Sequence, residues 1–153
     1  MIEALRFINV LGAAIMAGGQ LFVLMVVIPI KRQWDERRSV ELHQASLHTL
    51  PDRYLLPAGV ISGLAGLLWL VLEFGSDRWA TWLTLVGLLG IVGTAVTSQR
   101  FNKPTNRTIL GWSLDAIPPG YAEIRDRWDR VHTIRTASGL LALTAFLLAA
   151  VLE

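Results

Sequence analysis

The sequence has 153 residues, of which 53% are hydrophobic and 17% charged, and its formal net charge is +2. A soluble domain usually carries about 25% charged residues, and the few charges here are concentrated in two connecting segments, so a disordered chain, a collagen-like chain and an ordinary soluble globule are excluded. The absence of cysteine excludes disulfides, thiolate metal sites, iron–sulfur clusters and a cysteine nucleophile.

Four apolar runs follow one another along the chain, and each is long enough to cross a membrane as a helix. About 20 helical residues are needed to cross a hydrocarbon core of roughly 30 Å. None of the runs alternates apolar and polar residues as the strands of a membrane barrel do, and backbone groups in lipid must be paired within helices. The sequence therefore predicts an all-α integral membrane four-helix bundle, with residues 1–153 as a single domain and spans over about residues 7–30, 55–74, 79–97 and 136–152.

Glycines lie at helical spacing in the second and third spans. Gly59 and Gly63 are four residues apart, and Gly87, Gly90 and Gly93 repeat every three residues. Such residues give a helix a smooth face that a second backbone can approach closely. We expect these glycines to pack helices together, within the chain or between copies of a homo-oligomer, and not to take part in catalysis.

The orientation follows from the Lys and Arg residues in the connections. Those after the first and third spans carry most of the basic residues, whereas the other side has only Arg6 and Arg78. Because basic loops stay in the cytoplasm, we expect both long connections inside, both termini outside, and a multi-pass protein of the inner (plasma) membrane. This topology accounts for the basic charge, so no nucleic-acid partner is expected.

Each long connection contains a segment with the apolar period of a helix. In residues 35–50, Val40, His43 and Leu47 fall on one stripe. Residues 121–136 form a second such segment, which runs into the fourth span. We therefore expect the second and fourth helices to extend past the membrane on the cytoplasmic side and to form a polar mouth, where bundles commonly place their sites.

Two polar residues within or beside the spans are candidates for a site. Arg135 lies on the inward stripe of the last helix, where an ionisable group is costly and usually pairs with another group or serves a site. The alternative is that its side chain reaches the lipid headgroups. Gln20 lies in the middle of the first span, where it either bonds to another helix or contacts a substrate.

A proline flanked by two asparagines follows the third span, in the order Asn102, Lys103, Pro104, Thr105, Asn106. Asn side chains cap helices and stabilise turns, so one interpretation of the segment is that its role is purely structural. Alternatively, the two amides donate hydrogen bonds into the mouth of the bundle.

Together these residues resemble a known motif. An Asn-x-Pro-x-Asn element, followed about twenty residues later by Trp-x-x-x-His-x-x-Arg, is similar to the pattern of the anthrone oxygenase-like family of small four-helix membrane proteins. The matching residues are Asn102, Pro104, Asn106, Trp128, His132 and Arg135. The resemblance implies a membrane-embedded oxygenase or oxidoreductase, because the fungal members oxidise anthrones to anthraquinones with molecular oxygen and without a flavin or nicotinamide.

The resemblance also implies roles for individual residues. A lipophilic anthrone- or hydroquinone-like substrate needs a base that removes a proton and groups that stabilise the resulting anion. His132 suits the base, since the unperturbed pKa of histidine is about 6.5. The residues that suit stabilisation of the anion are Arg135, Asn102 and Asn106. The expected substrate contacts are Trp128, Gln20 and His43.

A metal centre is the rival to this mechanism. The chain has three histidines, His43, His48 and His132, and all are expected on the cytoplasmic side. Three imidazoles can bind copper, iron or zinc, although His43 and His48 are five residues apart, roughly 140° around a helix. We expect no cofactor and keep copper or iron as the alternative.

A non-enzymatic role is the other alternative. The chain would then be a membrane subunit or a small-ligand-binding bundle, with Trp128 as a membrane-interface anchor and His132 as a hydrogen-bonded polar residue at the helix mouth. A transporter has less support, because no span contains an internal carboxylate for proton coupling. The expected partners are membrane lipid and a lipophilic small molecule.

Overall fold

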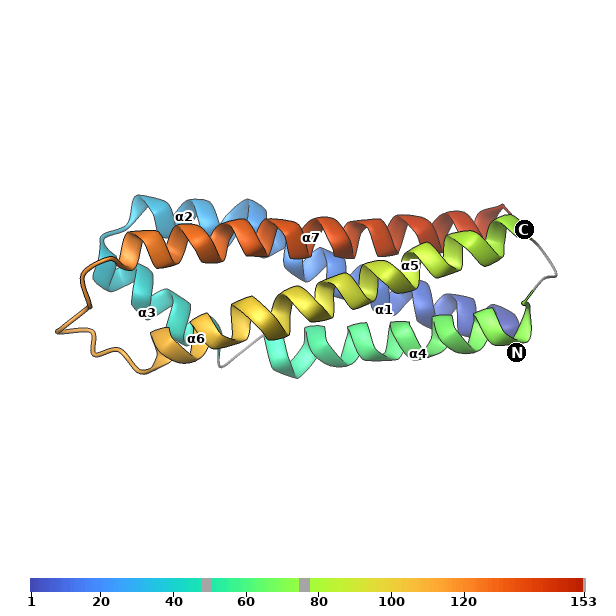
Figure 1. The fold of residues 1–153 in the computed structure, drawn as a ribbon, viewed down its shortest axis with the longest axis horizontal. Helices are drawn as coiled ribbons and strands as arrows, with labels where there is room; N and C mark the ends of the chain where they lie inside the picture. The colour runs from blue at the N-terminus through green and yellow to red at the C-terminus, as the bar shows by residue number, and fades with distance from the viewer. Residues whose placement is uncertain (48–50, 75–77, 153) are drawn as a thin grey trace.

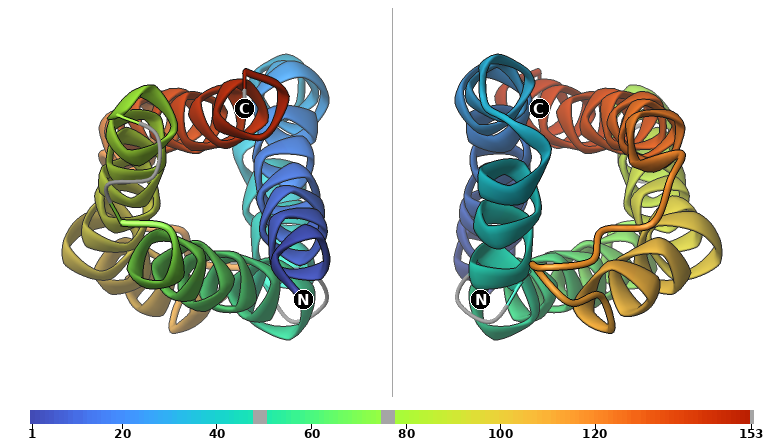
Figure 2. Two further views of the ribbon diagram at one scale, coloured as in Figure 1. Left: turned by 90° about the vertical axis from the view of Figure 1, so that its right-hand side faces the viewer. Right: turned by 90° about the vertical axis from the view of Figure 1, so that its left-hand side faces the viewer.

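The computed structural model describes residues 1–47, 51–74 and 78–152. The regular elements in these ranges are all helices, and four of them run side by side along the long axis of the molecule (Figure 1). These four are α1 (Ile2–Phe22), α4 (Leu56–Leu72), α5 (Arg78–Thr97) and α7 (Tyr121–Val151). Viewed along their length, they stand at the corners of a square in the order α1, α4, α5, α7 (Figure 2).

The prediction of four membrane-spanning helices in an all-α bundle is confirmed. Four helices are long and apolar enough to cross a membrane, and they cover Ile2–Gln33, Arg53–Leu72, Trp79–Leu110 and Tyr121–Val151. The first and third are longer than predicted, because α2 (Ile28–Gln33) continues the first helix and α6 (Lys103–Leu110) continues the third.

The helices extend beyond their apolar parts at one end of the molecule. The amphipathic segment predicted there is present as α3 (Glu36–Leu47), which packs against α2 and α6. The extension itself is made by α2, α6 and the first turns of α7 (Figure 1). In the described residues the first, third and fourth helices make this extension, and the second span begins with residue 51.

Three π-helical turns, whose backbone hydrogen bonds are one residue wider than those of an α-helix, explain why the helices continue. They are η1 (Val23–Val27), η2 (Pro51–Leu55) and η3 (Ser98–Asn102), and each ends two residues before a proline: Pro29, Pro57 or Pro104. Proline has no N–H and its ring clashes with the carbonyl four residues earlier. The wider turn accommodates the ring, as π adjustments do in membrane helices, so Pro29 and Pro104 do not end their helices.

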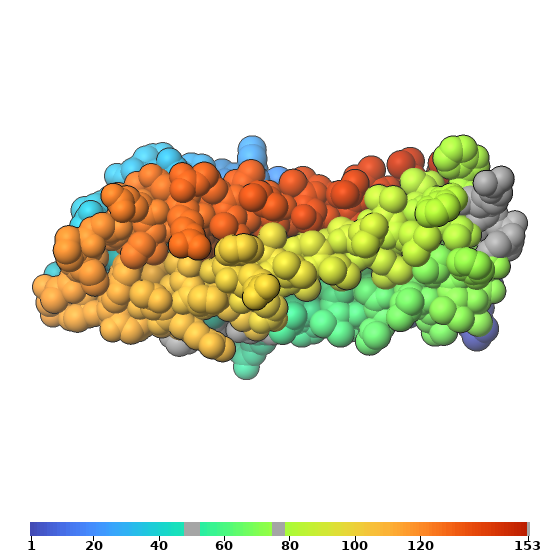
Figure 3. All heavy atoms as spheres, viewed as in Figure 1, coloured from blue at the N-terminus to red at the C-terminus, as the bar shows by residue number. Residues whose placement is uncertain are grey.

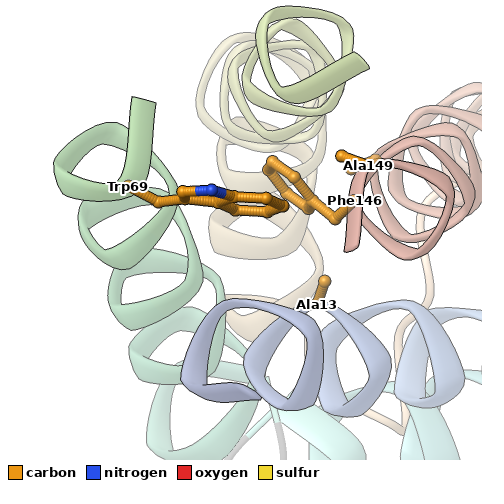
Figure 4. Packing of buried hydrophobic residues seen from close by; sticks show 5 residues of the cluster. Ala13, Trp69, Phe146 and Ala149 are labelled. Atoms are coloured by element: carbon orange, nitrogen blue, oxygen red, sulfur yellow. The ribbon is translucent and has the colours of Figure 1, made fainter. Parts of the chain in front are cut away.

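An apolar core fills the half of the bundle that holds the chain termini. Trp69 of α4 and Phe146 of α7 meet there, with the small side chains of Ala13 and Ala149 beside them (Figure 4). Alanines and glycines at these helix faces leave room for two large rings between four closely spaced backbones.

Glycines pack the helix pairs that make the most extensive contacts, α5 with α7 and α1 with α4. A Cβ atom on Gly90 of α5 would lie 2.7 Å from the carbonyl oxygen of Ser138 on α7. A Cβ atom on Gly12 of α1 would lie 2.7 Å from the carbonyl oxygen of Ala58 on α4. The predicted packing role is thus confirmed for Gly90.

A second, smaller apolar core closes the opposite end of the molecule. Val40 of α3, Ile109 of α6 and Tyr121 of α7 are all buried there, and the Tyr121 hydroxyl shares a hydrogen bond with Ser39. This core fixes α3 against α6 and α7, and thereby positions the polar side chains that these helices carry.

We expect Gly90→Ala to destabilise the bundle by roughly 1–3 kcal/mol, because overpacking forces α7 away from α5. The atom in the way belongs to the backbone of α7 and cannot move by itself. Unfolding in mixed detergent measures the difference. Gly18→Ala is the matched control, since a Cβ there would meet nothing within 4 Å. Equal stability of the two variants would contradict the assignment.

Candidate functional site

Two neighbouring features lie towards the end of the molecule formed by α2, α3 and α6. One is a group of buried or partly buried polar side chains, called here the polar cluster, which consists of Lys31, His43, Asn106, Trp128, Asp129 and His132. The other is a cavity between the four long helices. The π turns η2 and η3 contribute Leu55 and Ser98 to the cavity wall, and such turns are frequent at functional sites.

His43 of α3 is held from two sides in the polar cluster. Lys31 Nζ lies 3.2 Å from its Nδ1 atom, and its Nε2 atom lies 3.2 Å from Asn106 Oδ1. A lysine ammonium only donates, so Nδ1 accepts this bond and Nε2 carries the proton that His43 donates to Asn106. The indole of Trp128 donates to the same Asn106 oxygen over 2.7 Å. One amide oxygen thus joins α3, α6 and α7.

The pKa of His43 is lowered from its usual 6.5 to about 3, first by burial and second by the positive charge of Lys31. The hydrogen bond to Asn106 acts in the opposite direction. The imidazole is therefore neutral at physiological pH, which agrees with the direction of its two hydrogen bonds.

The indole of Trp128 forms the centre of the polar cluster. The ring of His132 stacks on it with centroids 5.0 Å apart, and the Lys31 ammonium lies 4.4 Å from the indole centroid. Asp129 balances the positive charge, with Oδ1 3.8 Å from Lys31 Nζ and Oδ2 accepting a hydrogen bond of 2.9 Å from Arg32. Trp128 is buried within this group and is not an exposed anchor at a membrane interface.

His132 has one nitrogen bound and one free. The side chain is completely buried, and its Nε2 atom lies 3.0 Å from the backbone oxygen of Gln20. A carbonyl oxygen only accepts, so Nε2 carries the proton and Nδ1 has the lone pair. Nδ1 has no hydrogen-bond partner among the described residues. His132 is thus a buried base whose reactive nitrogen is unoccupied.

The cavity has a volume of about 120 Å³ and is bounded by α1, α4, α5 and α7. Its wall is mostly apolar, with Met16, Val60 and Ile91 among the lining residues. Polar side chains also reach it from several helices: Gln20, Thr94, Ser98, Gln99, Lys103 and Arg135.

Two polar side chains in the cavity wall have an atom without a hydrogen-bond partner. Arg135 donates a long hydrogen bond of 3.5 Å from Nη1 to Ser98, its Nε atom has no hydrogen-bond partner, and it forms no ion pair with a carboxylate of the described residues. Gln20 is 3% exposed, and its Oε1 atom accepts no hydrogen bond from the described residues. An unpaired cation is costly in a membrane protein and indicates a functional site.

The structure divides the predicted site residues between the two features. His43, Asn106, Trp128 and His132 are in the polar cluster, and Gln20 and Arg135 line the cavity. The backbone oxygen of Gln20 joins them through its bond to His132.

Asn102 and Asn106 do not lie in a turn, because η3 lets the helix run through Pro104. Neither side chain caps a helix: Asn102 makes no cap bond, and Asn106 lies inside α6. Asn106 accepts hydrogen bonds into the cluster and does not donate them. Asn102 is buried, and neither of its amide atoms has a hydrogen-bond partner among the described residues.

The sequence did not identify Lys31, Arg32 and Asp129 as members of the site. Lys31 and Arg32 belong to the basic residues after the first span that indicate membrane orientation, and Asp129 lies within a run of alternating charges. Lys31 is 1% exposed in the fold. Its neighbours in the sequence carry no signal of this burial, because the contact depends on α3 and α7 folding back onto α2.

The three-histidine metal centre is not assembled by the part of the chain that the structure describes. No group of three His, Cys, Asp or Glu residues there could hold a metal ion, and His48 lies outside the described residues. Both nitrogens of His43 have protein partners, so a metal bound to His43 would have to replace Lys31 or Asn106.

We expect the free energy of unfolding to fall as the pH is lowered below 6.5, because His43 takes up a proton only in the unfolded chain. Between pH 6.5 and about 3 the unfolded chain binds a proton at His43 that the folded chain does not bind. Between pH 7.5 and pH 5 this contribution lowers the free energy of unfolding by roughly 2 kcal/mol. The His43→Gln variant lacks this contribution. Denaturant unfolding of the wild type and the variant at both pH values measures this difference. If the free energies of unfolding of the two proteins depend on pH in the same way, His43 is not buried as a neutral imidazole.

Comparison with known families identifies the family of this chain. Residues 50–148 match a family model described as anthrone oxygenase. No match was found among curated proteins or among solved structures. The matched segment contains the Asn-x-Pro-x-Asn and Trp-x-x-x-His-x-x-Arg residues, whereas α1, α2 and α3, which carry Gln20, Lys31 and His43, precede it. Since the match covers well over half of the 153 residues, the chain belongs to the anthrone oxygenase family.

Proposed function

We propose that this protein is a membrane oxidoreductase that oxidises a lipophilic, weakly acidic aromatic compound of the anthrone class with molecular oxygen. Family membership supports the general role. The observation that carries the specific proposal is the guanidinium of Arg135, which has no carboxylate partner among the described residues and lies in the wall of a mostly apolar cavity. Such a wall fits a molecule that is apolar over most of its surface and acquires a negative charge during the reaction.

Arg135 and Gln20 would bind the oxygen end of the substrate. The guanidinium donates hydrogen bonds to an oxygen that becomes anionic, and in a water-poor cavity this stabilisation is stronger than in water. The Oε1 atom of Gln20 is buried without a hydrogen-bond partner, and after a rotation of the side chain towards the cavity it can accept a hydrogen bond from a phenolic hydroxyl of the same molecule. Together the two side chains would orient a hydroxylated ring.

His132 would accept the proton. Its Nδ1 lone pair is free, and the bond from Nε2 to Gln20 fixes the tautomer in which Nδ1 is the base. His132 is bonded to the backbone of Gln20, which lines the cavity, but His132 itself is not among the lining residues. The proton transfer therefore requires a rotation of the Gln20 side chain or a bridging water molecule.

The chemistry balances without a further electron donor. The base removes a benzylic proton, and the resulting anion gives one electron to O2. The carbon radical and superoxide join to form a C–O bond, and the peroxide takes the proton back from the base. Loss of the second benzylic proton with cleavage of the O–O bond gives a ketone and water. A CH2 group and O2 thus become a C=O group and H2O, and the substrate supplies all four electrons.

We further propose that the polar cluster faces the cytoplasm, that both termini lie outside, and that the protein is in the inner membrane. Lys31 is buried and serves the cluster, so it no longer counts as a loop charge. Arg37 and Arg38 remain exposed on α3, and basic connections of this kind stay in the cytoplasm.

A structural role is favoured for part of the motif. His43, Asn106 and Trp128 satisfy one another across three helices and do not line the cavity. These residues would support the site, while Arg135, Gln20 and His132 would act on the substrate.

We expect Arg135→Gln to lower oxygen uptake with dihydroxyanthrone by about 100-fold or more, because an anion-stabilising donor is lost. Arg135→Lys should retain part of the activity, since the charge remains. Arg130→Gln is the control on the same helix, at an exposed position. Similar rates for the Arg135→Gln and Arg130→Gln variants would remove the main support for the proposal.

We expect His132→Gln to fold and insert normally and to lose about 10²–10⁴-fold in rate, as on removal of a general base. The comparison is Trp128→Phe, which loses the hydrogen bond to Asn106 and should mainly lower thermal stability. Rates and melting temperatures in mild detergent separate the two roles. If His132→Gln loses activity only because less of the protein is folded, the result favours the alternative of a non-enzymatic membrane protein.

A further inference from the structure

The seam between α4 and α5 is the least extensively packed side of the bundle. The two helices are neighbours on one side of the square (Figure 2), and among the described residues they make fewer contacts with each other than any other neighbouring pair of long helices. The face on which α5 runs between α7 and α4 is shown in Figure 3. Gly63 of α4 lies close to Ile91 of α5, and Ile91 also lines the cavity.

The cavity lies along this seam and reaches the outer surface of the bundle there. Leu56 and Val60 of α4 line it and are 45% and 50% exposed. Ala95 of α5 lines it from the facing helix and is also exposed. At its inner wall the cavity meets Gln20, which is buried. In a membrane-spanning bundle the exposed side of α4 and α5 faces lipid, so the cavity connects the bilayer with the interior.

The size of the cavity limits what enters it. A cavity of about 150 Å³ in a well-packed protein holds one benzene molecule, so the volume of about 120 Å³ found here suits a single aromatic ring. A substrate with several fused rings must therefore leave its remaining rings between α4 and α5. The guanidinium of Arg135 and the amide of Gln20, which line the cavity, attract the oxygen-bearing ring inwards.

We propose that a planar, fused-ring substrate enters from the bilayer between α4 and α5, with its hydroxylated ring first, and reacts while its outer ring stays in the seam. The proposal rests on the function proposed above, because it gives the access route to the same cavity. Molecules with a charged group at the end opposite the hydroxylated ring are excluded, since that end lies in lipid.

The absence of cysteine from the sequence makes this route testable by single thiols. Ala95→Cys places a thiol in the cavity rim, and Leu89→Cys places one on the same helix at a residue that is 69% exposed and lies outside the cavity. Both variants are placed in nanodiscs without oxygen, which prevents turnover. Alkylation by N-ethylmaleimide is then timed with and without dihydroxyanthrone, and tryptophan fluorescence reports binding independently.

Dihydroxyanthrone at ten times its dissociation constant should slow alkylation of the Ala95→Cys thiol about tenfold, as simple occupancy requires, and leave that of the Leu89→Cys thiol unchanged. Prior alkylation at position 95 should abolish binding. Val60→Cys, on the α4 side of the seam, gives the same test if the first variant folds poorly. Binding with unaltered alkylation at both rim positions overturns the access route and leaves the proposed function standing. No binding, together with no oxygen uptake by the wild-type protein, overturns both.

Discussion

A proline inside a membrane helix leaves a backbone carbonyl without its partner in a place where water cannot replace it. The chain meets this constraint three times, and each time a π turn precedes the proline. The helices therefore continue, and α2 and α6 carry Lys31 and Asn106 beyond the apolar bundle. There α3 and α7 bring His43 and Trp128 to meet them. The site thus depends on backbone pairing before it depends on any side-chain chemistry.

Polar groups are treated differently in the two parts of the site. In the polar cluster, Asn106 accepts two hydrogen bonds through one oxygen, and Asp129 balances two cations. Networks of this kind hold their members in one geometry. In the cavity wall, Arg135 and Gln20 keep unpaired atoms. His132 lies at the border, with one nitrogen held and the other free. The polar cluster, whose geometry is fixed, thus lies directly beside a cavity wall that still has polar groups available to bind a ligand.

The bundle could be predicted from the sequence because apolar length and helical period are local properties. The path of the helix through Pro104 could not, since a proline can either end a helix or be accommodated by a π turn before it. Asn106 was therefore recognised as part of a motif, but its position inside a continuous helix was not. Arg135 could be singled out, because a charge on the inward stripe of an apolar helix is unusual. Lys31 could not, because Arg32 beside it has the same charge and yet is half exposed.

The unpaired charge of Arg135 also bears on how a catalytic cycle ends. If the substrate binds as an anion, its attraction to the guanidinium includes a full ionic contribution. A ketone product carries no net charge and offers the same guanidinium only the weaker hydrogen bond of a neutral acceptor. Arg135 would therefore hold the reactant more tightly than the product. A site built in this way favours release and is little affected by product inhibition, even when the product accumulates in the surrounding lipid.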